Sequence, residues 1–391
     1  MECVRAGKAG AFFVDGPGGT GKIFLYNALY AEVQLMGEVV FPTSSSAIAA
    51  SNIPSGRTAH SRFKIPLDSD VSLCCDVPKQ SSLAALIRAY RLIIWDEASM
   101  ARRQNIESLD LLLRDLCDPN LLFGGKVVVF GGDFCETLPV VPEKSRVEIV
   151  EASLVSSVLW LKLIKFGLTE NLRARSDPEF AGFLLALGNG SLLNKEFEYI
   201  QLPSGIVRSP EDVSPNPITD LISVAFPEFC LELFDSDIFT TRAIITPLNE
   251  VMDTINDALI DKFPGYPVSC KSYDAMLDDN CNIYPSEFIN KLNPGGMSPH
   301  NLILKERCPV ILLSNLQPSF GLCNGTRLIC KRFYPNSVEC VITTGHHKGE
   351  HAFIPRIKLH PATSANYPFQ FQRTQFPLKL SFEMTFSKCQ G

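Results

Sequence analysis

The stretch at residues 11–29, AFFVDGPGGTGKIFLYNAL, constrains the fold of this chain more than any other. An apolar segment leads into a glycine-rich turn and a lysine, and Phe24, Leu25 and Leu29 follow at the spacing of one buried helix face. This order of strand, glycine-rich turn and helix is typical of a phosphate-binding loop. The segment therefore predicts an α/β sheet with a nucleotide at its edge.

The glycines matter because the phosphates of a nucleotide bind backbone N–H groups, and side chains would hold the backbone away. The helix that begins near Lys22 adds the positive end of its dipole, and the Lys22 ammonium can reach the β and γ phosphates. A glycine-rich turn without a ligand is the alternative. The residues expected to bind the nucleotide are Gly16, Pro17, Gly18, Gly19, Thr20, Gly21, Lys22 and Ile23.

Ile23 departs from the motif, which has Ser or Thr after the lysine. The hydroxyl of that residue binds the Mg²⁺ that bridges the phosphates, and isoleucine has no lone pair to offer. We therefore expect phosphate binding to survive while metal positioning and hydrolysis suffer.

Two adjacent acids, Asp96 and Glu97, end a second apolar segment, LIIW at residues 92–95. Two carboxylates at the mouth of a buried strand are costly unless a cation or a donor meets them. Asp96 is expected to hold Mg²⁺, and Glu97 is then left to polarise an attacking water.

Two segments between these motifs have the composition of a single-strand binding path. A strand at residues 38–41 precedes hydroxyl residues that include Thr43 and Ser46, although simple helix capping is the alternative. Residues 57–64, RTAHSRFK, combine cations with His60 and Phe63, which suits phosphate contacts with base stacking. A solvated loop that does not bind nucleic acid would have the same composition.

Composition limits the classes of protein. The formal net charge of -6 offers no general attraction for nucleic acid, so any such site must be a local groove. The 13 cysteines include no C-x-x-C pair, which indicates free thiols in a reducing compartment.

Repeated strand-to-loop motifs in the first half predict a doubly wound parallel sheet. Short strands broken by Gly, Asn and Pro in the second half predict a small antiparallel barrel. The expected domains are a first lobe at 1–188 with a small insertion at 64–85, a linker at 189–237, and an incomplete second lobe at 238–391 with a barrel at 300–360.

With these motifs in place, the sequence resembles the Pif-type (petite integration frequency) family of ATP-dependent 5′→3′ DNA helicases, in particular its Helitron-like branch. The resemblance implies an α/β fold with two RecA-like P-loop lobes and a small antiparallel SH3-like barrel inserted in the second lobe. It also implies single-stranded DNA and duplex junctions as partners, a nuclear location, and roles in DNA repair, recombination and telomere maintenance. The blocks that resemble the family are FFVDGPGGTGK, FPTSSSAIAA, GRTAHSRFKIPLD, LIIWDEASM, FGGKVVVFGGDF, LTENLRA, GLCNGTRLI, FIPRI and QFPLKLSFEMTFSKCQG.

Matched by position, the resemblance implies that Lys22 binds the phosphates, that Asp96 binds the Mg²⁺ and that Glu97 is the catalytic base. It gives Arg173 a contact to the γ-phosphate. The residues expected along the DNA path are Thr43, Ser46, His60 and Phe63 in the first lobe and Thr385, Lys388 and Gln390 in the second.

Several departures from the family pattern suggest a truncated or decayed copy. Besides Ile23, Cys135 and Glu136 stand where the family has Arg-Gln, and residues 387–389 read Ser-Lys-Cys instead of Asn-Lys-Ser. A Glu136 carboxylate facing the γ-phosphate would repel what a glutamine would bind. The family's adenine-contacting segment and last arginine block are also expected beyond the two ends of the chain. The alternative function is therefore a catalytically impaired transposon remnant that binds nucleotide or single-stranded DNA without unwinding. A third possible function is that of a P-loop kinase or another NTPase unrelated to DNA, and the acid pair Asp96–Glu97 argues against a kinase.

Overall fold

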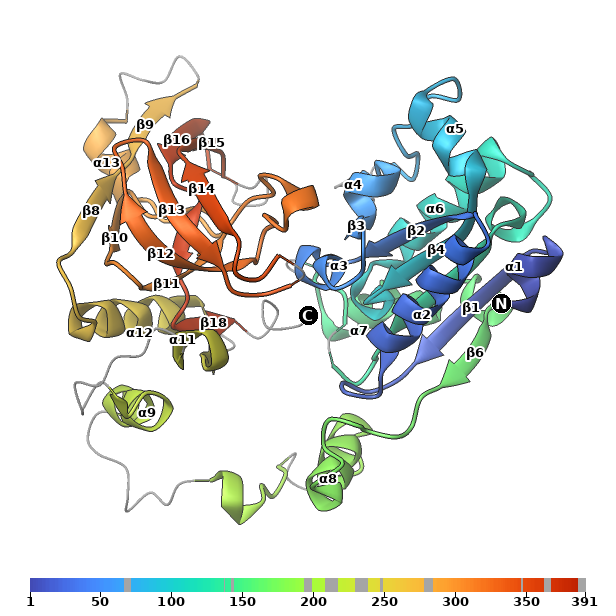
Figure 1. Ribbon diagram of the computed structural model, residues 1–391, viewed down its shortest axis with the longest axis horizontal. Coiled ribbons are helices and arrows are strands. Elements are labelled where there is room, and N and C mark those ends of the chain that lie inside the picture. Colours follow the sequence, from blue (N-terminus) through green and yellow to red (C-terminus); the bar gives the residue numbers. More distant parts are fainter. Residues whose placement is uncertain are drawn as a thin grey trace. The chain divides into compact units, whose positions relative to one another are not determined.

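The chain forms two compact units in the computed structural model, Met1–Pro203 and Ser204–Gly391 (Figure 1). The division falls inside the segment predicted to be a linker. The residues that the structure describes are 1–66, 72–136, 138–141, 144–192, 199–207, 217–228, 238–246, 249–277, 284–345, 347–361 and 367–385.

The first unit is built on a six-stranded sheet with the order β3-β2-β4-β5-β1-β6. All of its strand pairs are parallel, as predicted. The strands are β1 (Gly10–Asp15), β2 (Val39–Ser44), β3 (Arg57–Thr58), β4 (Tyr90–Asp96), β5 (Val127–Gly132) and β6 (Ile164–Gly167). The helices are α1 (Glu2–Ala6), α2 (Lys22–Leu35), α3 (Ala47–Ser51), α4 (Ala59–Phe63), α5 (Ser82–Ala89), α6 (Arg103–Leu116), α7 (Arg146–Glu151) and α8 (Pro178–Gly188).

The central strands are apolar throughout because helices cover both faces of the sheet. Tyr26 and Val33 of α2 pack in one core cluster with Ile94 of β4. Leu109 of α6 packs in another with Trp95, the next residue along the same strand. Successive residues of a strand point to opposite faces, so α2 and α6 cover opposite faces of the sheet (Figure 1).

This strand order places three chain turns next to one another at one edge of the sheet. The strands β4, β5 and β1 are neighbours, and Asp15 at the end of β1 is level with Gly132 at the end of β5. Because the strands are parallel, the residues that follow them emerge on the same side, where open α/β sheets bind ligands.

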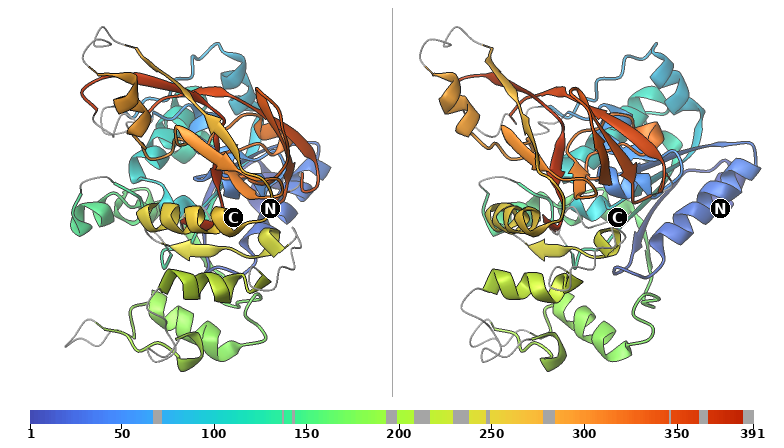
Figure 2. Two further views of the ribbon diagram at one scale, coloured as in Figure 1. Left: turned by 90° about the vertical axis from the view of Figure 1, so that its left-hand side faces the viewer. Right: turned by 60° about the vertical axis from the view of Figure 1, so that its left-hand side comes forward.

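The second unit combines a parallel strand pair with antiparallel sheets (Figure 2). The strands β7 (Ile244–Thr246) and β18 (Glu383–Thr385) pair in parallel, and the helix α12 (Asn249–Lys262) packs against both. A five-stranded antiparallel sheet has the order β14-β13-β12-β11-β17. Its strands are β11 (Pro309–Leu312), β12 (Arg327–Phe333), β13 (Ser337–Ile342), β14 (His351–Pro355) and β17 (Leu378–Leu380).

Among the described residues of this unit, the smaller elements include two antiparallel sheets and three α-helices. The sheets consist of β8 (Val268–Lys271) with β10 (Asn301–Leu304), and of β9 (Tyr273–Met276), β16 (Phe371–Gln375) and β15 (Ile357–Leu359). The helices are α9 (Pro217–Ala225), α11 (Ile238–Thr241) and α13 (Ser286–Lys291). One core cluster includes Ile244 of β7, Leu259 of α12 and Val310 of β11, so the parallel pair and the five-stranded sheet share a core.

Two general properties follow from the described part of the chain. The cysteines described there are all free thiols, as the sequence predicts. Among the described helices, none combines the length and the apolar character needed to cross a bilayer.

Candidate active site

The glycine-rich loop joins β1 to α2, as predicted. Gly19 and Gly21 adopt φ angles of 87° and 89°, which residues with a side chain rarely adopt. A Cβ atom at Gly19 would also lie 2.6 Å from Asn171 Oδ1. The helix α2 begins at Lys22, so the positive end of its dipole lies at the loop. The backbone geometry is therefore that of a phosphate-binding loop.

The Lys22 ammonium lies inside the curl of this loop. Its Nζ donates a hydrogen bond to the Gly16 carbonyl oxygen at 2.6 Å. The Thr20 hydroxyl donates to the Pro17 carbonyl oxygen at 2.8 Å and closes the turn. An ammonium has three donors, so a phosphate oxygen can bind Lys22 while the loop keeps its shape.

Carboxyl groups from three neighbouring strand ends surround this ammonium. Asp15 ends β1, and Asp96 ends β4 with Glu97 directly after it. Glu136 follows β5 after a short turn. Burial raises the pKa of all four carboxyls, and the positive charge of Lys22 opposes that rise in each, so one ammonium faces four acids.

Burial outweighs that attraction. It raises the pKa of Asp96 to about 6. Burial, together with the charges of Asp96 and Glu136, raises the pKa of Glu97 to about 7. Burial and the nearby Asp133 also raise the pKa of Glu136. The site thus contains more negative charge than Lys22 can neutralise.

A divalent cation suits this excess of carboxylates. Asp96 is 2% exposed, and its Oδ1 atom has no hydrogen-bond partner among the residues that the structure describes. An unpaired, buried carboxylate oxygen is the kind of ligand that Mg²⁺ takes. Asp96 therefore fits a metal, whereas Ile23 contributes no oxygen atom, as the sequence indicates.

Glu97 has an unusual backbone conformation. Its φ of 54° and ψ of 37° lie in the left-handed region, which is uncommon for a residue other than glycine. Such conformations are found preferentially at functional sites, where the surrounding structure holds them. The turn sends the chain away from the sheet and leaves the Glu97 carboxyl under the influence of Asp96 and Lys22.

Arg173 lies on a loop that is bound to the glycine-rich loop. The Leu172 N–H donates to the Gly19 carbonyl oxygen at 3.0 Å. Asn171 Oδ1 accepts hydrogen bonds from the N–H groups of Arg173 and Ala174 at 3.1 and 3.0 Å. These contacts place Arg173 beside the phosphate loop, although its role toward a γ-phosphate stays a prediction.

Glu136 lies on the other side of the same space. A Cβ atom at Gly18 would be 3.1 Å from Glu136 Oε1, and the positive charge of Arg173 lowers the pKa of Glu136. Gly18, Glu136 and Arg173 line one cavity of about 1010 Å³, which continues along apolar residues of α8 such as Leu184. The structure therefore brings Glu136, Arg173 and the glycine-rich loop together at one site.

The residues predicted to line a DNA path in this unit are less exposed than expected. The strand β2 extends to Ser44 because it pairs with β4 as far as Asp96. Thr43 is therefore buried inside a strand, and its hydroxyl donates to the Ile94 carbonyl oxygen at 2.7 Å. The expectation that Thr43 lines a surface path is wrong for this reason.

Phe63 requires the same correction. Its ring is 0% exposed and packs against Phe41 and Trp95, with ring centroids 5.4 and 6.3 Å apart. It is a core residue that supports α4. Ser46 accepts a hydrogen bond from the Ala49 N–H and caps α3, which was the alternative reading of that segment. His60 is half-buried in α4, where burial lowers the pKa of its imidazole.

The predicted site residues of the second unit are mostly outside the described residues. Lys388 and Gln390 both lie outside them. The backbone of Thr385 forms the last residue of β18. Their roles toward DNA remain predictions.

Four residues of the site were not singled out from the sequence. Asp15 and Asp133 each follow or end an apolar strand, and that position was the signal that could have identified them. Asn171 shapes the Arg173 loop, and Tyr26 places its hydroxyl near Asp96. No sequence pattern marks these two, because their contacts join segments far apart in the chain.

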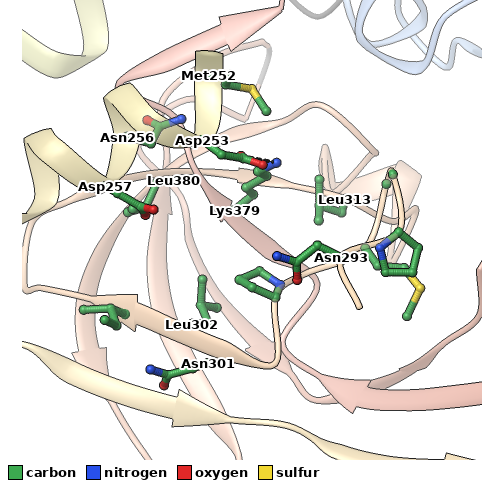
Figure 3. A pocket seen from close by; sticks show the side chains of 16 residues that line it. Met252, Asp253, Asn256, Asp257, Asn293, Asn301, Leu302, Leu313, Lys379 and Leu380 are labelled. Carbon is green, nitrogen blue, oxygen red and sulfur yellow. Dashed lines mark ion pairs between the residues drawn. The ribbon is translucent and has the colours of Figure 1, made fainter. Parts of the chain in front are cut away.

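The second unit contains a separate cavity of about 520 Å³ between α12 and the antiparallel strands (Figure 3). Lys379 of β17 forms an ion pair with Asp253 of α12 at 2.6 Å. Burial, together with Asp253, raises the pKa of the neighbouring Asp257. The ion pair joins the helix to the five-stranded sheet across this cavity.

Comparison with known proteins agrees with this geometry. The family model of the PIF1-like helicase matches residues 1–198, and the model of the DNA helicase Pif1 2B domain matches residues 287–333. The ATP-dependent DNA helicase PIF1 of Danio rerio is 24% identical over 404 residues, which cover 100% of this chain and 54% of that protein. The chain thus spans about half the length of this curated relative.

Two solved structures share the fold. Bacteroides Pif1 bound to ssDNA has a TM-score of 0.67 and 21% identity, over 100% of this chain and 82% of that one. Pif1 helicase from Bacteroides in complex with ADP-AlF3 and ssDNA has a TM-score of 0.66 and 20% identity, over 98% and 80%. At this level of identity the likeness shows the fold alone, and it confirms the predicted α/β architecture of two lobes with separate antiparallel sheets.

The matched segment of the first family model, residues 1–198, is more than half of the 391 residues. It contains the glycine-rich loop, the acid pair and the arginine loop that converge in the structure. This chain therefore belongs to the PIF1-like helicase family.

Proposed function

We propose that this protein is an ATP-dependent DNA helicase that couples ATP hydrolysis to 5′→3′ movement along single-stranded DNA. The supporting observation is the single Lys22 ammonium, held in a glycine-rich loop and faced by carboxyls from three neighbouring strand ends. Membership of the family agrees with it, and a solved Pif1 relative is in complex with ADP-AlF3 and ssDNA.

The proposal extends to features that rest on the resemblance alone. These are the direction of movement, the Helitron-like origin, a nuclear location, duplex junctions as partners, and roles in DNA repair, recombination and telomere maintenance.

Each residue of the site has a chemical task in this proposal. Lys22 and the loop N–H groups bind the β and γ phosphates. Asp96 would hold Mg²⁺, which when bound neutralises charge on the phosphates. Glu97 orients the attacking water and accepts its proton, for which a pKa of about 7 is suitable near neutral pH. Arg173 would contact the γ-phosphate from its loop beside Gly19.

A second candidate function is a protein that binds nucleotide or single-stranded DNA without unwinding. Ile23 and Glu136 favour it. Ile23 removes a metal ligand from the phosphate loop, and Glu136 places a carboxyl where the family has a glutamine. Removing one positioned catalytic donor typically lowers a rate by about 10²–10³.

ATP hydrolysis with and without single-stranded DNA separates the two candidates. We compare the unchanged chain, Glu97→Gln, and the double variant Ile23→Thr/Glu136→Gln. A helicase predicts DNA-stimulated turnover by the unchanged chain that exceeds that of Glu97→Gln, and unwinding of a duplex that has a 5′ single-stranded tail.

The impaired candidate predicts nucleotide binding that needs Lys22, turnover equal to that of Glu97→Gln, and recovery in the double variant. Absence of Lys22-dependent nucleotide binding would contradict both candidates.

A further inference from the structure

Glu136 places a carboxylate against the backbone of the glycine-rich loop. A Cβ atom at Gly18 would lie only 3.1 Å from Glu136 Oε1, so the carboxylate lies directly beside this residue of the loop. Gly18 and Glu136 line the same cavity of about 1010 Å³, and Glu136 is exposed. A ligand whose phosphates bind the loop therefore meets this negative charge.

The cations of the site lie on the same side of the loop as this carboxylate. Lys22 Nζ donates a hydrogen bond to the Gly16 carbonyl oxygen at 2.6 Å and a longer one to that of Pro17 at 3.5 Å. The side chain of Lys22 is thus folded back over the first half of the loop. Arg173 lines the cavity together with Glu136. The carboxylate therefore shares its surroundings with the two cations that the proposed site uses for phosphate.

The carboxylate also lies on the side of the outermost phosphate. The N–H groups at the start of α2 bind the inner phosphates of a nucleotide, and the attacking water approaches the γ-phosphate from the opposite side. Glu97, which we propose to orient that water, follows β4, and Glu136 follows the neighbouring strand β5. A diphosphate can bind with this carboxylate in place, whereas a triphosphate brings a further charged group next to it.

We propose that Glu136 makes this site selective for nucleoside diphosphates, because its carboxylate takes part of the space of a γ-phosphate and repels the charge that a triphosphate adds. This inference rests on the proposed nucleotide site and deepens it, because it gives the site a regulation by ADP. When ATP and ADP are equally abundant, ADP occupies the site, and turnover requires a large excess of ATP.

The expected size of the preference follows from the charge and its exposure. A nearby charge typically shifts the equilibrium of another charged group by about 10–1000-fold. Glu136 is exposed, so water and salt weaken its effect, and we expect the lower end of this range.

The test is the ratio of two dissociation constants of the full chain, measured by calorimetric titration at about pH 8, where carboxylates are ionised. The ligands are ADP and the non-hydrolysable β,γ-imido analogue of ATP, both with Mg²⁺. We expect the unchanged chain to bind ADP at least about tenfold more tightly than the analogue. Glu136→Gln keeps the size of the side chain and removes its charge, so it should tighten the binding of the analogue and leave that of ADP nearly unchanged.

Two results of this titration overturn the inference. One is a ratio of the two dissociation constants that is the same in the unchanged chain and in Glu136→Gln. The other is weaker binding of the analogue by Glu136→Gln, because the carboxylate would then assist the γ-phosphate, as a metal ligand does.

The matched control is Glu170→Gln, which removes one negative charge elsewhere in the same cavity. The Glu170 side chain is 70% exposed, and its carboxylate lies 3.9 Å from the guanidinium of Arg175. Because Arg175 balances this charge, Glu170→Gln should leave the ratio unchanged. An equal change of the ratio in Glu170→Gln and Glu136→Gln overturns the inference, because the total charge of the cavity would then set the preference.

The dependence on salt gives a second readout that the size of a side chain cannot produce. Repulsion between exposed charges weakens as ionic strength rises. Between about 0.05 M and about 0.5 M KCl, the preference of the unchanged chain for ADP should fall more steeply than that of Glu136→Gln. The same salt dependence of the ratio in both chains overturns the inference.

Lys22→Ala separates a failure of this inference from a failure of the proposed function. Both nucleotides should bind Lys22→Ala at least about tenfold more weakly than they bind the unchanged chain. Equal binding by these two chains contradicts the proposed nucleotide site itself. Binding that needs Lys22, with a ratio that does not depend on Glu136, contradicts only the further inference.

Discussion

Replacing Glu97 by glutamine should stabilise the first unit while it abolishes turnover. The Glu97 carboxyl has a pKa of about 7 in the folded chain, against an ordinary value of 4.5, chiefly because it is buried. A raised carboxyl pKa means that the folded state binds the proton more tightly than the unfolded state does. Its cost to stability is therefore absent below about pH 4.5, grows as the pH rises, and is complete above about pH 7.

The size of this effect follows from the shift itself. A difference of about 2.5 pKa units at about 1.4 kcal/mol per unit corresponds to about 3 kcal/mol of lost stability above neutral pH. Glu97→Gln keeps the shape of the side chain and removes the charge. It should recover about 3 kcal/mol at pH 8 and little at pH 4.5, while the loss of the general base lowers turnover by about 10²–10⁴.

Tryptophan fluorescence during urea unfolding measures this in the intact protein. The only tryptophans of the sequence, Trp95 and Trp160, both belong to the first unit, so the signal reports that unit. The matched control is Glu151→Gln at the exposed end of α7, which should leave the pH profile unchanged. A Glu97→Gln chain that loses as much stability as the unchanged chain between about pH 5 and about pH 8 refutes the reasoning.

Three further outcomes follow from the structure. Glu136→Gln should tighten the binding of a non-hydrolysable ATP analogue about tenfold above neutral pH, and less at acidic pH, where Glu136 is protonated. Calorimetric titration measures these affinities. If the variant and the unchanged chain bound the analogue equally well at both pH values, the assigned repulsion would be contradicted. Gly19→Ala should weaken nucleotide binding by at least about tenfold, because Gly19 has a φ of 87° and lies against Asn171. The control Gly205→Ala should not weaken it, because a Cβ atom there meets no atom within 4 Å. Nucleotide titration measures both variants, and equal affinities of the two would show that the loop geometry is unimportant. Glu383→Gln should slow hydrogen exchange of β12 amides at about pH 8 and not at about pH 5, because burial raises the pKa of the buried Glu383 to about 7 and its ionisation above that pH destabilises the second unit. Equal protection of these amides in the two chains at about pH 8 would contradict it.

The parts of the site that are local in sequence could be predicted from it. The glycine-rich loop and the acid pair after β4 are defined by short motifs, because each occupies one turn between a strand and the next element. Their meeting at one sheet edge also followed, since parallel strands place their carboxyl ends together. The same applies to the strands β11 to β14, whose Gly, Asn and Pro breaks are visible in the sequence.

The parts that depend on tertiary packing could not be predicted. Thr43 and Phe63 have residue types that suit a DNA path, yet β2 pairs with β4 for longer than its apolar run suggests, and Phe63 fills the space above Trp95. Burial of this kind depends on neighbours that are distant in the chain. The same reason explains why Tyr26 was not identified, since only the folded chain brings its hydroxyl to Asp96.

The most direct test of the nucleotide site is equilibrium binding of a fluorescent ATP analogue to the full chain and to Lys22→Ala. The lysine makes a charge-assisted contact to phosphate, for which about 1.5–3 kcal/mol is typical. We therefore predict that Lys22→Ala binds the analogue about 10–100-fold more weakly than the unchanged chain does. Equal affinity in the two chains would contradict the assignment of this loop as the phosphate site.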